Sequence, residues 1–215
     1  MERAPLQQEG TIGRARSARC QVAYDLHICP VGSPYGWWAK PGWFFCIAAC
    51  NMAPRSRGTL RLASPDPTVA PIMDHGYLTD EDDHDLEVLL DGVEIVRSLA
   101  AQPPLAGLLG RETGPSLDLD RQALRAAVRA NCVHYYHPVG TCRMGPASDP
   151  LAVVDNRGRM HGLEGVRVAD ASIMPVVPRA NTNLPTIVVG EKLAAALLED
   201  IGQLTAAAAV GTKRP

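Results

Sequence analysis

The stretch VHYYHPVGTCRMG, residues 133–145, contains the residues that decide how this sequence is interpreted. His137 directly precedes a proline, which pushes the backbone of the histidine towards extended geometry, and Gly140 permits a tight turn three residues later. A histidine held rigidly at such a junction can act as a general base near neutral pH. Taken alone, a histidine at such a position is more often a hydrogen-bonded structural residue, so both interpretations stand at this point.

A second informative stretch, ANTNLPTIVVGEK at residues 180–192, leads from a proline-rich loop into the expected start of a helix. The side-chain amides of Asn181 and Asn183 can each donate and accept hydrogen bonds, and helix N-termini present free backbone N–H groups to polar ligands. Asn183, just before Leu-Pro-Thr, also suits the N-cap of that helix. The stretch therefore predicts either a binding loop or an ordinary helix cap.

Two strands are expected early in the chain, at residues 22–31 and 43–53, because aromatic and β-branched residues are concentrated there. The glycines and prolines of residues 32–42 indicate a loop between them. Trp37 and Trp38 lie in that loop, where they would either line a pocket or cover the edge of a core.

Helical signals follow at three places. Thr79 is an expected N-cap, and the acids at 80–83 suit the positive end of a helix that stops before Pro103. A second helix is expected from Asp118 to Asn131, and a third over residues 184–201 with a proline in its first turn. The apolar residues expected to face inward in the first two helices are Leu86, Leu89, Leu90, Val93, Val96, Leu99, Leu124, Ala127 and Val128.

The remaining chain predicts shorter elements and irregular segments. TLRLAS, in which Leu60 and Leu62 share one face, is expected to form a strand, while the prolines that follow it forbid regular structure. The further expectations are a disordered lead-in at 1–22, a hairpin at 153–162, a short buried strand at 166–172 and a tail at 204–215.

Composition excludes some classes of function. The formal net charge of −2 argues against a nucleic-acid binder that works by neutralising phosphates. No apolar run approaches the ~20 residues of a spanning helix, and residues 1–20 lack the apolar core of a secretory signal. The six cysteines therefore read as reduced thiols in a cytoplasmic protein. A zinc site at His27, Cys29, Cys46 and Cys50 is a weaker alternative, because structural zinc sites prefer closer pairs.

Four motifs in order resemble the C-terminal part of the glucose-methanol-choline (GMC) oxidoreductases: PRSRGTLRL, YHPVGTCRMG, VVDNRGRMHGLEGVRVADASIMP and NTNLPTIVVGEK. The resemblance extends from about residue 23 to residue 200. It implies an α+β fold in which an antiparallel-sheet substrate domain with helices is followed by a segment that completes an FAD-binding α/β domain. The corresponding divisions of this chain are residues 23–135 and 136–203.

The resemblance also implies a site and a chemistry. His137 matches the family's catalytic histidine, which takes the hydroxyl proton of an alcohol, and Asn181 matches the second active-site residue. FAD is the implied cofactor and accepts the hydride. The residues matching flavin-binding positions are Asp170, Ala171, Thr182 and Asn183.

One feature of the family is absent. A GxGxxG turn cradles the FAD pyrophosphate in the family's N-terminal Rossmann part, and this sequence contains no GxGxxG. The chain is therefore expected to be the C-terminal portion of an alcohol oxidoreductase, whose partners are a small alcohol and an N-terminal FAD-binding half. The alternative is a non-catalytic remnant or interaction subunit that does not bind FAD alone.

Overall fold

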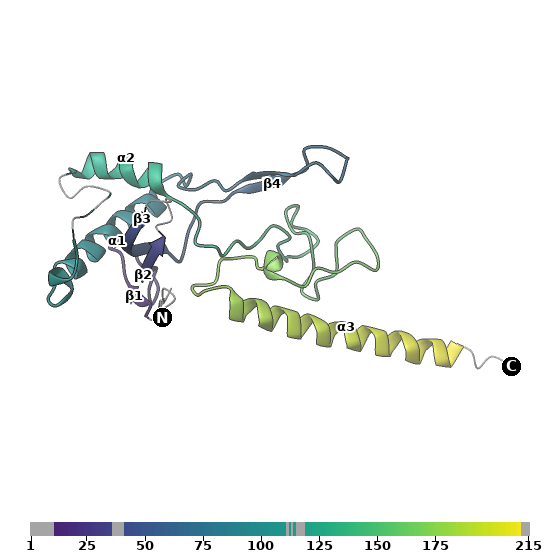
Figure 1. Ribbon diagram of the computed structural model, residues 1–215. Coiled ribbons are helices and arrows are strands. Elements are labelled where there is room, and N and C mark those ends of the chain that lie inside the picture. Colours follow the sequence, from purple (N-terminus) through teal and green to yellow (C-terminus); the bar gives the residue numbers. More distant parts are fainter. Residues whose placement is uncertain (1–10, 36–40, 111, 113, 115–118, 212–215) are drawn as a thin grey trace. The chain divides into compact units, whose positions relative to one another are not determined.

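The computed structural model describes residues 11–35, 41–110, 112, 114 and 119–211 (Figure 1). The chain divides into two units, Met1–Val133 (unit 1) and His134–Pro215 (unit 2). The division falls two residues before the boundary expected between 135 and 136. Trp37 and Trp38 lie outside the described residues.

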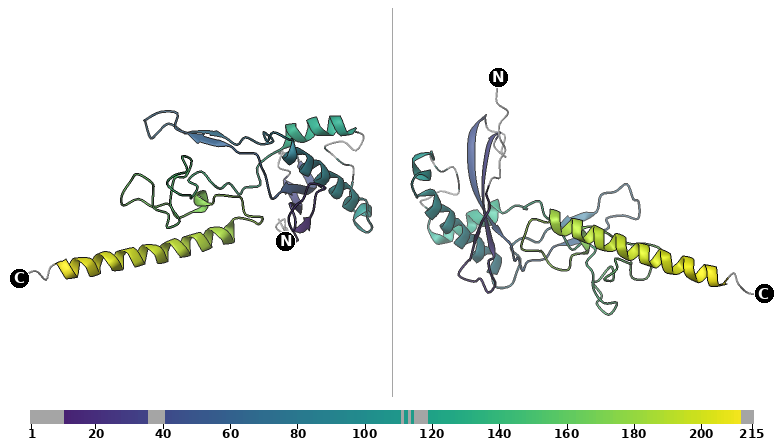
Figure 2. Two further views of the ribbon diagram at one scale, coloured as in Figure 1. Left: turned by 180° about the vertical axis from the view of Figure 1, so that it is seen from behind. Right: turned by 90° about the horizontal axis from the view of Figure 1, so that it is seen from below.

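An antiparallel sheet of order β1-β2-β3 forms the base of unit 1, from β1 (Gly13–Ala15), β2 (Leu26–Tyr35) and β3 (Pro41–Asn51). β2 and β3 make the long hairpin seen in Figure 2. Both strands predicted for this region are confirmed, and both extend into the segment expected to be a loop.

The predicted disordered lead-in is wrong for residues 13–15, which pair with β2. The connection between β1 and β2 is fastened by the buried carboxylate of Asp25. That carboxylate accepts hydrogen bonds from the backbone N–H of Ser17 at 2.8 Å and from its hydroxyl at 2.6 Å. A buried carboxylate must be satisfied in this way, and the pair holds β1 beside β2.

Helices α1 (His84–Ala100) and α2 (Arg121–Asn131) complete unit 1, with the 3-10 turn η1 (Leu105–Gly107) between them. α1 packs on the hairpin, where a Cβ on Gly92 would lie 2.7 Å from the Cβ of Ala49. A glycine is therefore required for this close approach. The helices enclose a core of buried side chains: Leu78, Leu86, Leu90, Leu124 and Val128.

The predicted N-cap of α1 at Thr79 is wrong, since the helix begins at His84. The Thr79 hydroxyl donates to the carbonyl of Gly76, and the Asp80 carboxylate accepts from the backbone N–H of His84 at 2.5 Å. An acid therefore binds at the positive end of the helix, as expected. The residue whose side chain binds a backbone N–H there is Asp80, and not Thr79. The second helix also begins later than predicted, at Arg121, with Asp120 as its N-cap.

A two-stranded ribbon of β4 (Thr59–Arg61) and β5 (Ile72–Asp74) also belongs to unit 1. β4 lies within the predicted strand at 59–64. β5 was not predicted, because three residues between a proline-rich segment and a turn carry too little alternation to signal a strand. Both strands are exposed along their length.

Unit 2 contains one long helix, α3 (Asn183–Gly211), and the 3-10 turn η2 (Ala171–Ile173). The expected hairpin at 153–162 is reduced to one isolated antiparallel bridge, Val154 to Met160, and Val154 also forms a parallel bridge with Met144. The predicted buried strand at 166–172 is wrong. Ala169 and Asp170 are exposed, and the Asp170 carboxylate accepts from Ser172 N–H, which starts η2 instead.

The helix predicted at 184–201 is confirmed, and it continues to Gly211. The predicted tail at 204–215 is therefore wrong as far as residue 211, because the alanine-rich segment has high helix propensity. The inner face of α3 contributes Val189 and Leu193 to a second small core with Val154 and Ile173. Within the described residues, none of the helices has the length and apolarity to cross a membrane.

Candidate active site

The site residues that the sequence singled out all lie in unit 2, on the loop after residue 134, at η2 and at the start of α3. The loop is shaped by two residues with positive φ, Tyr136 at 59° and Gly140 at 87°. A Cβ on Gly140 would lie 3.3 Å from the carbonyl oxygen of Met174. Glycine is favoured there for both its conformation and its close approach, so His137 and Pro138 stand between two fixed turns.

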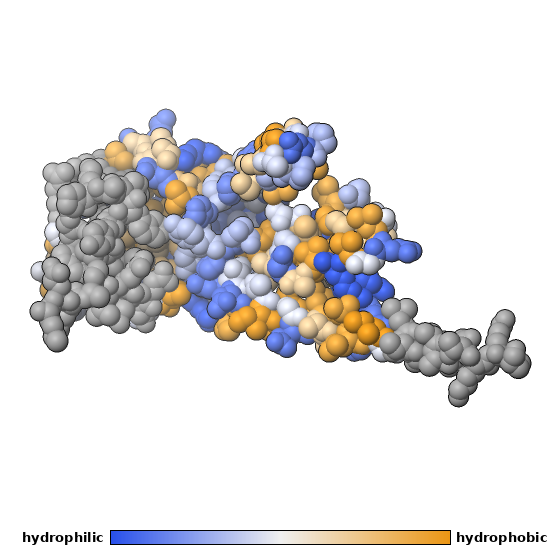
Figure 3. Space-filling view, turned by 45° about the vertical axis from the view of Figure 1, so that its right-hand side comes forward, coloured by the Kyte–Doolittle hydropathy of each residue, from blue (hydrophilic) through white to orange (hydrophobic). Residues whose placement is uncertain are grey.

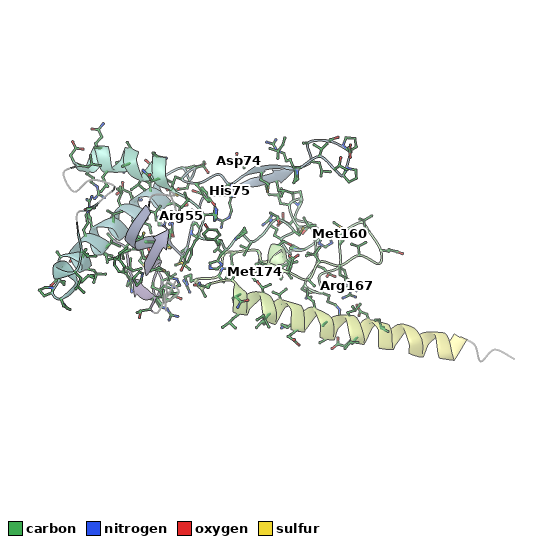
Figure 4. All side chains as sticks on the ribbon, in the orientation of Figure 1. Arg55, Asp74, His75, Met160, Arg167 and Met174 are labelled. Atoms are coloured by element: carbon green, nitrogen blue, oxygen red, sulfur yellow. The ribbon has the colours of Figure 1, made fainter. Side chains whose placement is uncertain are left out.

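Backbone hydrogen bonds join this loop to η2. Cys142 N–H donates to the carbonyl of Ser172 at 2.9 Å, and Met144 N–H donates to the carbonyl of Ile173 at 2.8 Å. Met174 follows directly, and Figure 4 labels it at the turn beside η2. Because these bonds use main-chain atoms, they fix the loop irrespective of the side chains that it carries.

The imidazole of His137 contacts the residue that precedes α3. Its Nδ1 lies 3.0 Å from the hydroxyl oxygen of Thr182, which is 8% exposed. The Tyr135 ring meets the same imidazole edge to face, at 5.0 Å between ring centres. The structure therefore brings together two predicted site residues, His137 and Thr182, that are 45 positions apart in the sequence.

The other four predicted site residues lie next to Thr182 in the sequence or at η2. Asn181 is half-buried and adjoins Thr182, whereas Asn183 is the exposed first residue of α3. The N-cap suggested for Asn183 is therefore wrong, because Thr182 precedes the helix. In the described part of the chain, no hydrogen bond joins Asn181 to His137. Asp170 is exposed, Ala171 is half-buried, and both lie at η2.

Ion pairs fix α3 against the rest of unit 2. Arg167, labelled near α3 in Figure 4, pairs with Asp200, and Arg157 binds the same carboxylate at 2.8 Å. The hydrogen bond from Arg167 lowers the pKa of Asp200, and the bond from Arg157 adds to this effect. Arg157 also donates to the carbonyl of Ala196 at 2.7 Å. These contacts position the helix whose first turn follows Thr182.

His27 and the three cysteines suggested as a zinc site do not cluster as ligands. β2–β3 pairing sets His27 opposite Cys50 and Val31 opposite Cys46. Burial raises the pKa of the Cys46 thiol, which disfavours a thiolate. Over the ranges that the structure describes, no group of three or more histidine, cysteine or acidic residues could hold a metal ion. No disulfide joins any of the six cysteines, all of which lie in described residues.

Sequence reasoning missed what holds the PRSRG segment in unit 1. The carboxylate of Asp85, 3% exposed, accepts from the backbone N–H groups of Arg55 at 2.9 Å and Ser56 at 2.8 Å. Asn51 adds a third bond to Asp85 at 3.1 Å. An acid directly after the start of a helix gave no signal of this role, because carboxylates in first turns are common for other reasons.

The family model described as GMC oxidoreductase matches residues 54–190. The match covers more than half of the chain and includes the loop of His137, η2 and the start of α3. This chain belongs to the GMC oxidoreductase family.

Curated relatives extend the match. Oxygen-dependent choline dehydrogenase 1 of Chromohalobacter salexigens is 41% identical over 172 residues, which are 79% of this chain and 30% of the relative. An alcohol dehydrogenase [acceptor] of Pseudomonas putida is 36% identical over 175 residues, 80% of this chain and 31% of the relative. The chain thus spans about a third of the length of these relatives.

Solved structures agree on the fold. A formate oxidase from Aspergillus oryzae RIB40, determined in work on modification of its FAD, superposes with a TM-score of 0.73 at 25% identity. The match covers 84% of this chain and 32% of that one. The α+β class predicted from the sequence, with antiparallel sheets and helices, is confirmed.

Proposed function

We propose that this chain is the C-terminal catalytic portion of an FAD-dependent oxidoreductase that oxidises a CH–OH donor. The observation that carries the proposal is the contact of His137 with Thr182 at the start of α3. It joins two of the four motifs that resemble the GMC family, YHPVGTCRMG and NTNLPTIVVGEK, within one unit. The names of the relatives support an alcohol as substrate, since they are a choline dehydrogenase and an alcohol dehydrogenase.

His137 acts as the general base. An alcohol carbon gives up hydride readily only as its hydroxyl loses a proton, and a neutral imidazole in hydrogen-bond reach can take that proton. Nδ1 is engaged by Thr182, so Nε2 is the nitrogen that receives the proton. The side-chain amide of Asn181 holds the alcohol oxygen and orients the carbon that is oxidised.

The residues at η2 and the start of α3 fit the polyol and ring portions of FAD. Ser172 N–H binds Oδ1 of the exposed Asp170, which leaves Oδ2 able to accept from a hydroxyl. Ala171 is the first residue of η2, and Asn183, the exposed first residue of α3, has a side-chain amide that can donate and accept hydrogen bonds. Thr182 fits least well, because its hydroxyl already binds His137. FAD, when bound, supplies the acceptor for the hydride.

The pyrophosphate of FAD needs a second polypeptide segment, since this sequence has no GxGxxG turn. The outer face of α3 is suited to contact that segment. Figure 3 shows hydrophobic residues, in orange, on the part of the chain that leads to its C-terminal end. The exposed apolar residues of that face include Leu184 (72%), Val188 (57%) and Leu198 (70%). Such a face is typical of an interaction surface.

The missing turn also favours a second candidate, a subunit that does not bind FAD alone. An absorption spectrum of the purified chain, recorded after addition of FAD and desalting, separates the two. Flavin bands that survive would mean that the chain holds the cofactor by itself. A colourless protein would support the second candidate for the isolated chain. The next experiment is then a chimaera in which this chain replaces the matching segment of the Chromohalobacter salexigens relative.

The two asparagines provide a matched pair in that chimaera. Asn181→Ala should slow choline oxidation more than Asn183→Ala, because Asn181 adjoins the His137 contact and Asn183 is exposed. The reverse order would transfer the orienting role to Asn183.

A further inference from the structure

Thr182 stands in an unusual position for a residue before a helix, because its hydroxyl faces a side chain rather than the first helical N–H groups. The hydroxyl lies 3.0 Å from Nδ1 of His137. The carbonyl of Thr182 accepts from both the backbone N–H of Thr186 at 2.9 Å and the Thr186 hydroxyl at 2.7 Å. The first turn of α3 thus fixes the backbone of Thr182. Because Thr182 is only 8% exposed, its hydroxyl has little freedom to rotate towards solvent.

A neutral imidazole carries one proton, on either Nδ1 or Nε2, and the partner of one nitrogen decides the state of the other. In the described residues, Thr182 is the hydrogen-bond partner of the His137 ring, and it binds Nδ1. If Nδ1 carries the proton and donates it to Thr182, Nε2 keeps a lone pair. If the hydroxyl donates to Nδ1, Nε2 carries the proton and is unable to accept another.

We infer that Thr182 is a positioning residue that accepts a hydrogen bond from Nδ1–H of His137 and so keeps Nε2 unprotonated. The inference deepens the proposed function and rests on it for its purpose, because only an unprotonated Nε2 accepts the proton of an alcohol. The tautomer itself is a property of this chain and is measurable without cofactor or substrate.

The same unit contains a histidine that must hold the opposite tautomer. Nε2 of His161 lies 3.1 Å from the carbonyl oxygen of Gly145. A carbonyl only accepts hydrogen bonds, so Nε2 of His161 carries the proton. His161 is therefore an internal reference, in the same sample, for the pattern that His137 should not show.

The test is a long-range ¹H–¹⁵N correlation spectrum of the ¹⁵N-labelled 215-residue chain, at a pH where imidazole is neutral. A His137→Gln spectrum assigns the His137 signals by their loss. We expect the Nδ1–H pattern for His137 and the Nε2–H pattern for His161. An Nε2–H pattern for His137 in the unaltered chain would overturn the inference.

Two substitutions then test whether Thr182 causes the tautomer. Thr182→Val keeps the shape and removes the hydroxyl, so the His137 signals should move towards the Nε2–H pattern. Thr182→Ser keeps a hydroxyl and should preserve the Nδ1–H pattern. An unchanged His161 pattern and circular dichroism spectrum report that each variant is folded. A Thr182→Val chain that retains Nδ1–H at His137 would refute the positioning role.

In the chimaeric enzyme, Thr182→Val should lower kcat about tenfold with little change in KM, which is part of the ~10²–10⁴-fold that a general base contributes. Thr182→Ser should restore most of the rate. The two inferences fail separately. Full activity of a His137→Ala chimaera would remove the base and leave the tautomer result standing, whereas an Nε2–H tautomer would remove the role of Thr182 alone.

Discussion

The two units of this chain are stabilised in different ways. In unit 1, apolar side chains from α1 and α2 form a core, and arginines of α2 pair with Glu87 of α1 and with Asp83, the residue before α1. In unit 2, the small core of Val154, Ile173 and Leu193 is supplemented by backbone hydrogen bonds between loops and by ion pairs to α3. The predicted site lies in unit 2, where the main chain rather than a regular sheet fixes the positions of the functional groups.

Because unit 1 depends on an apolar core, the largest loss of stability is expected when a core side chain of unit 1 is shortened. Leu86→Ala removes a side chain with no exposure, and we expect a loss of ~2–5 kcal/mol in the free energy of unfolding. Hydrogen exchange followed by mass spectrometry should show faster exchange within residues 1–133 and unchanged protection in α3. Equal acceleration in both units would show that they unfold as one.

For His137→Ala, we expect a large loss of activity and little loss of stability. The substitution leaves the core of unit 2 intact but removes the proposed base, so the chimaeric enzyme should lose about 10²-fold or more in turnover. Thermal unfolding should change little, since the ring is half-buried and outside the core. A turnover near that of the parent chimaera would remove His137 from the mechanism.

A smaller effect, dependent on pH, is expected at the ion pairs of α3. Hydrogen bonds from Arg167 and then Arg157 lower the pKa of Asp200. A lowered carboxyl pKa stabilises the fold above the ordinary Asp value of ~3.9, and this contribution is lost as the pH falls through the folded value. Asp200→Asn should therefore destabilise unit 2 at pH 7, and the difference from the unaltered chain should shrink under acid conditions. A difference that stays constant with pH would contradict an ionic role.

The smallest effect on stability is expected on the outer face of α3. Leu198→Ser alters a side chain that is 70% exposed and should change the free energy of unfolding by less than ~0.5 kcal/mol. Leu193→Ser, on the inner face and 6% exposed, should be far more destabilising. If the outer face contacts the FAD-binding segment, Leu198→Ser should nevertheless weaken flavin retention in the chimaera. Unchanged retention would assign that contact to another surface.

Local sequence signals succeeded where a pattern is repeated over many residues. The helical spacing of apolar residues such as Leu86 and Leu90 predicted α1, and the spacing around Leu124 predicted α2. The segment that begins at Leu184 predicted α3. Signals failed for short elements. β5 has three residues, and the strand predicted at 166–172 is replaced by an isolated bridge from Arg167 to Arg159. Three-residue patterns carry too little periodicity to separate a strand from a turn.

By itself, the sequence determined the family, the α+β class and the identity of His137 as the candidate base, because ordered motifs and long apolar periods are written in adjacent residues. The tertiary structure alone decided that Thr182 contacts His137, that Asp85 holds the PRSRG segment and that Thr182 rather than Asn183 precedes α3. The physical reason is that each of the two contacts joins residues at least 29 positions apart, since hydrogen bonds between distant segments depend on how the chain folds back and leave no periodic trace in the sequence.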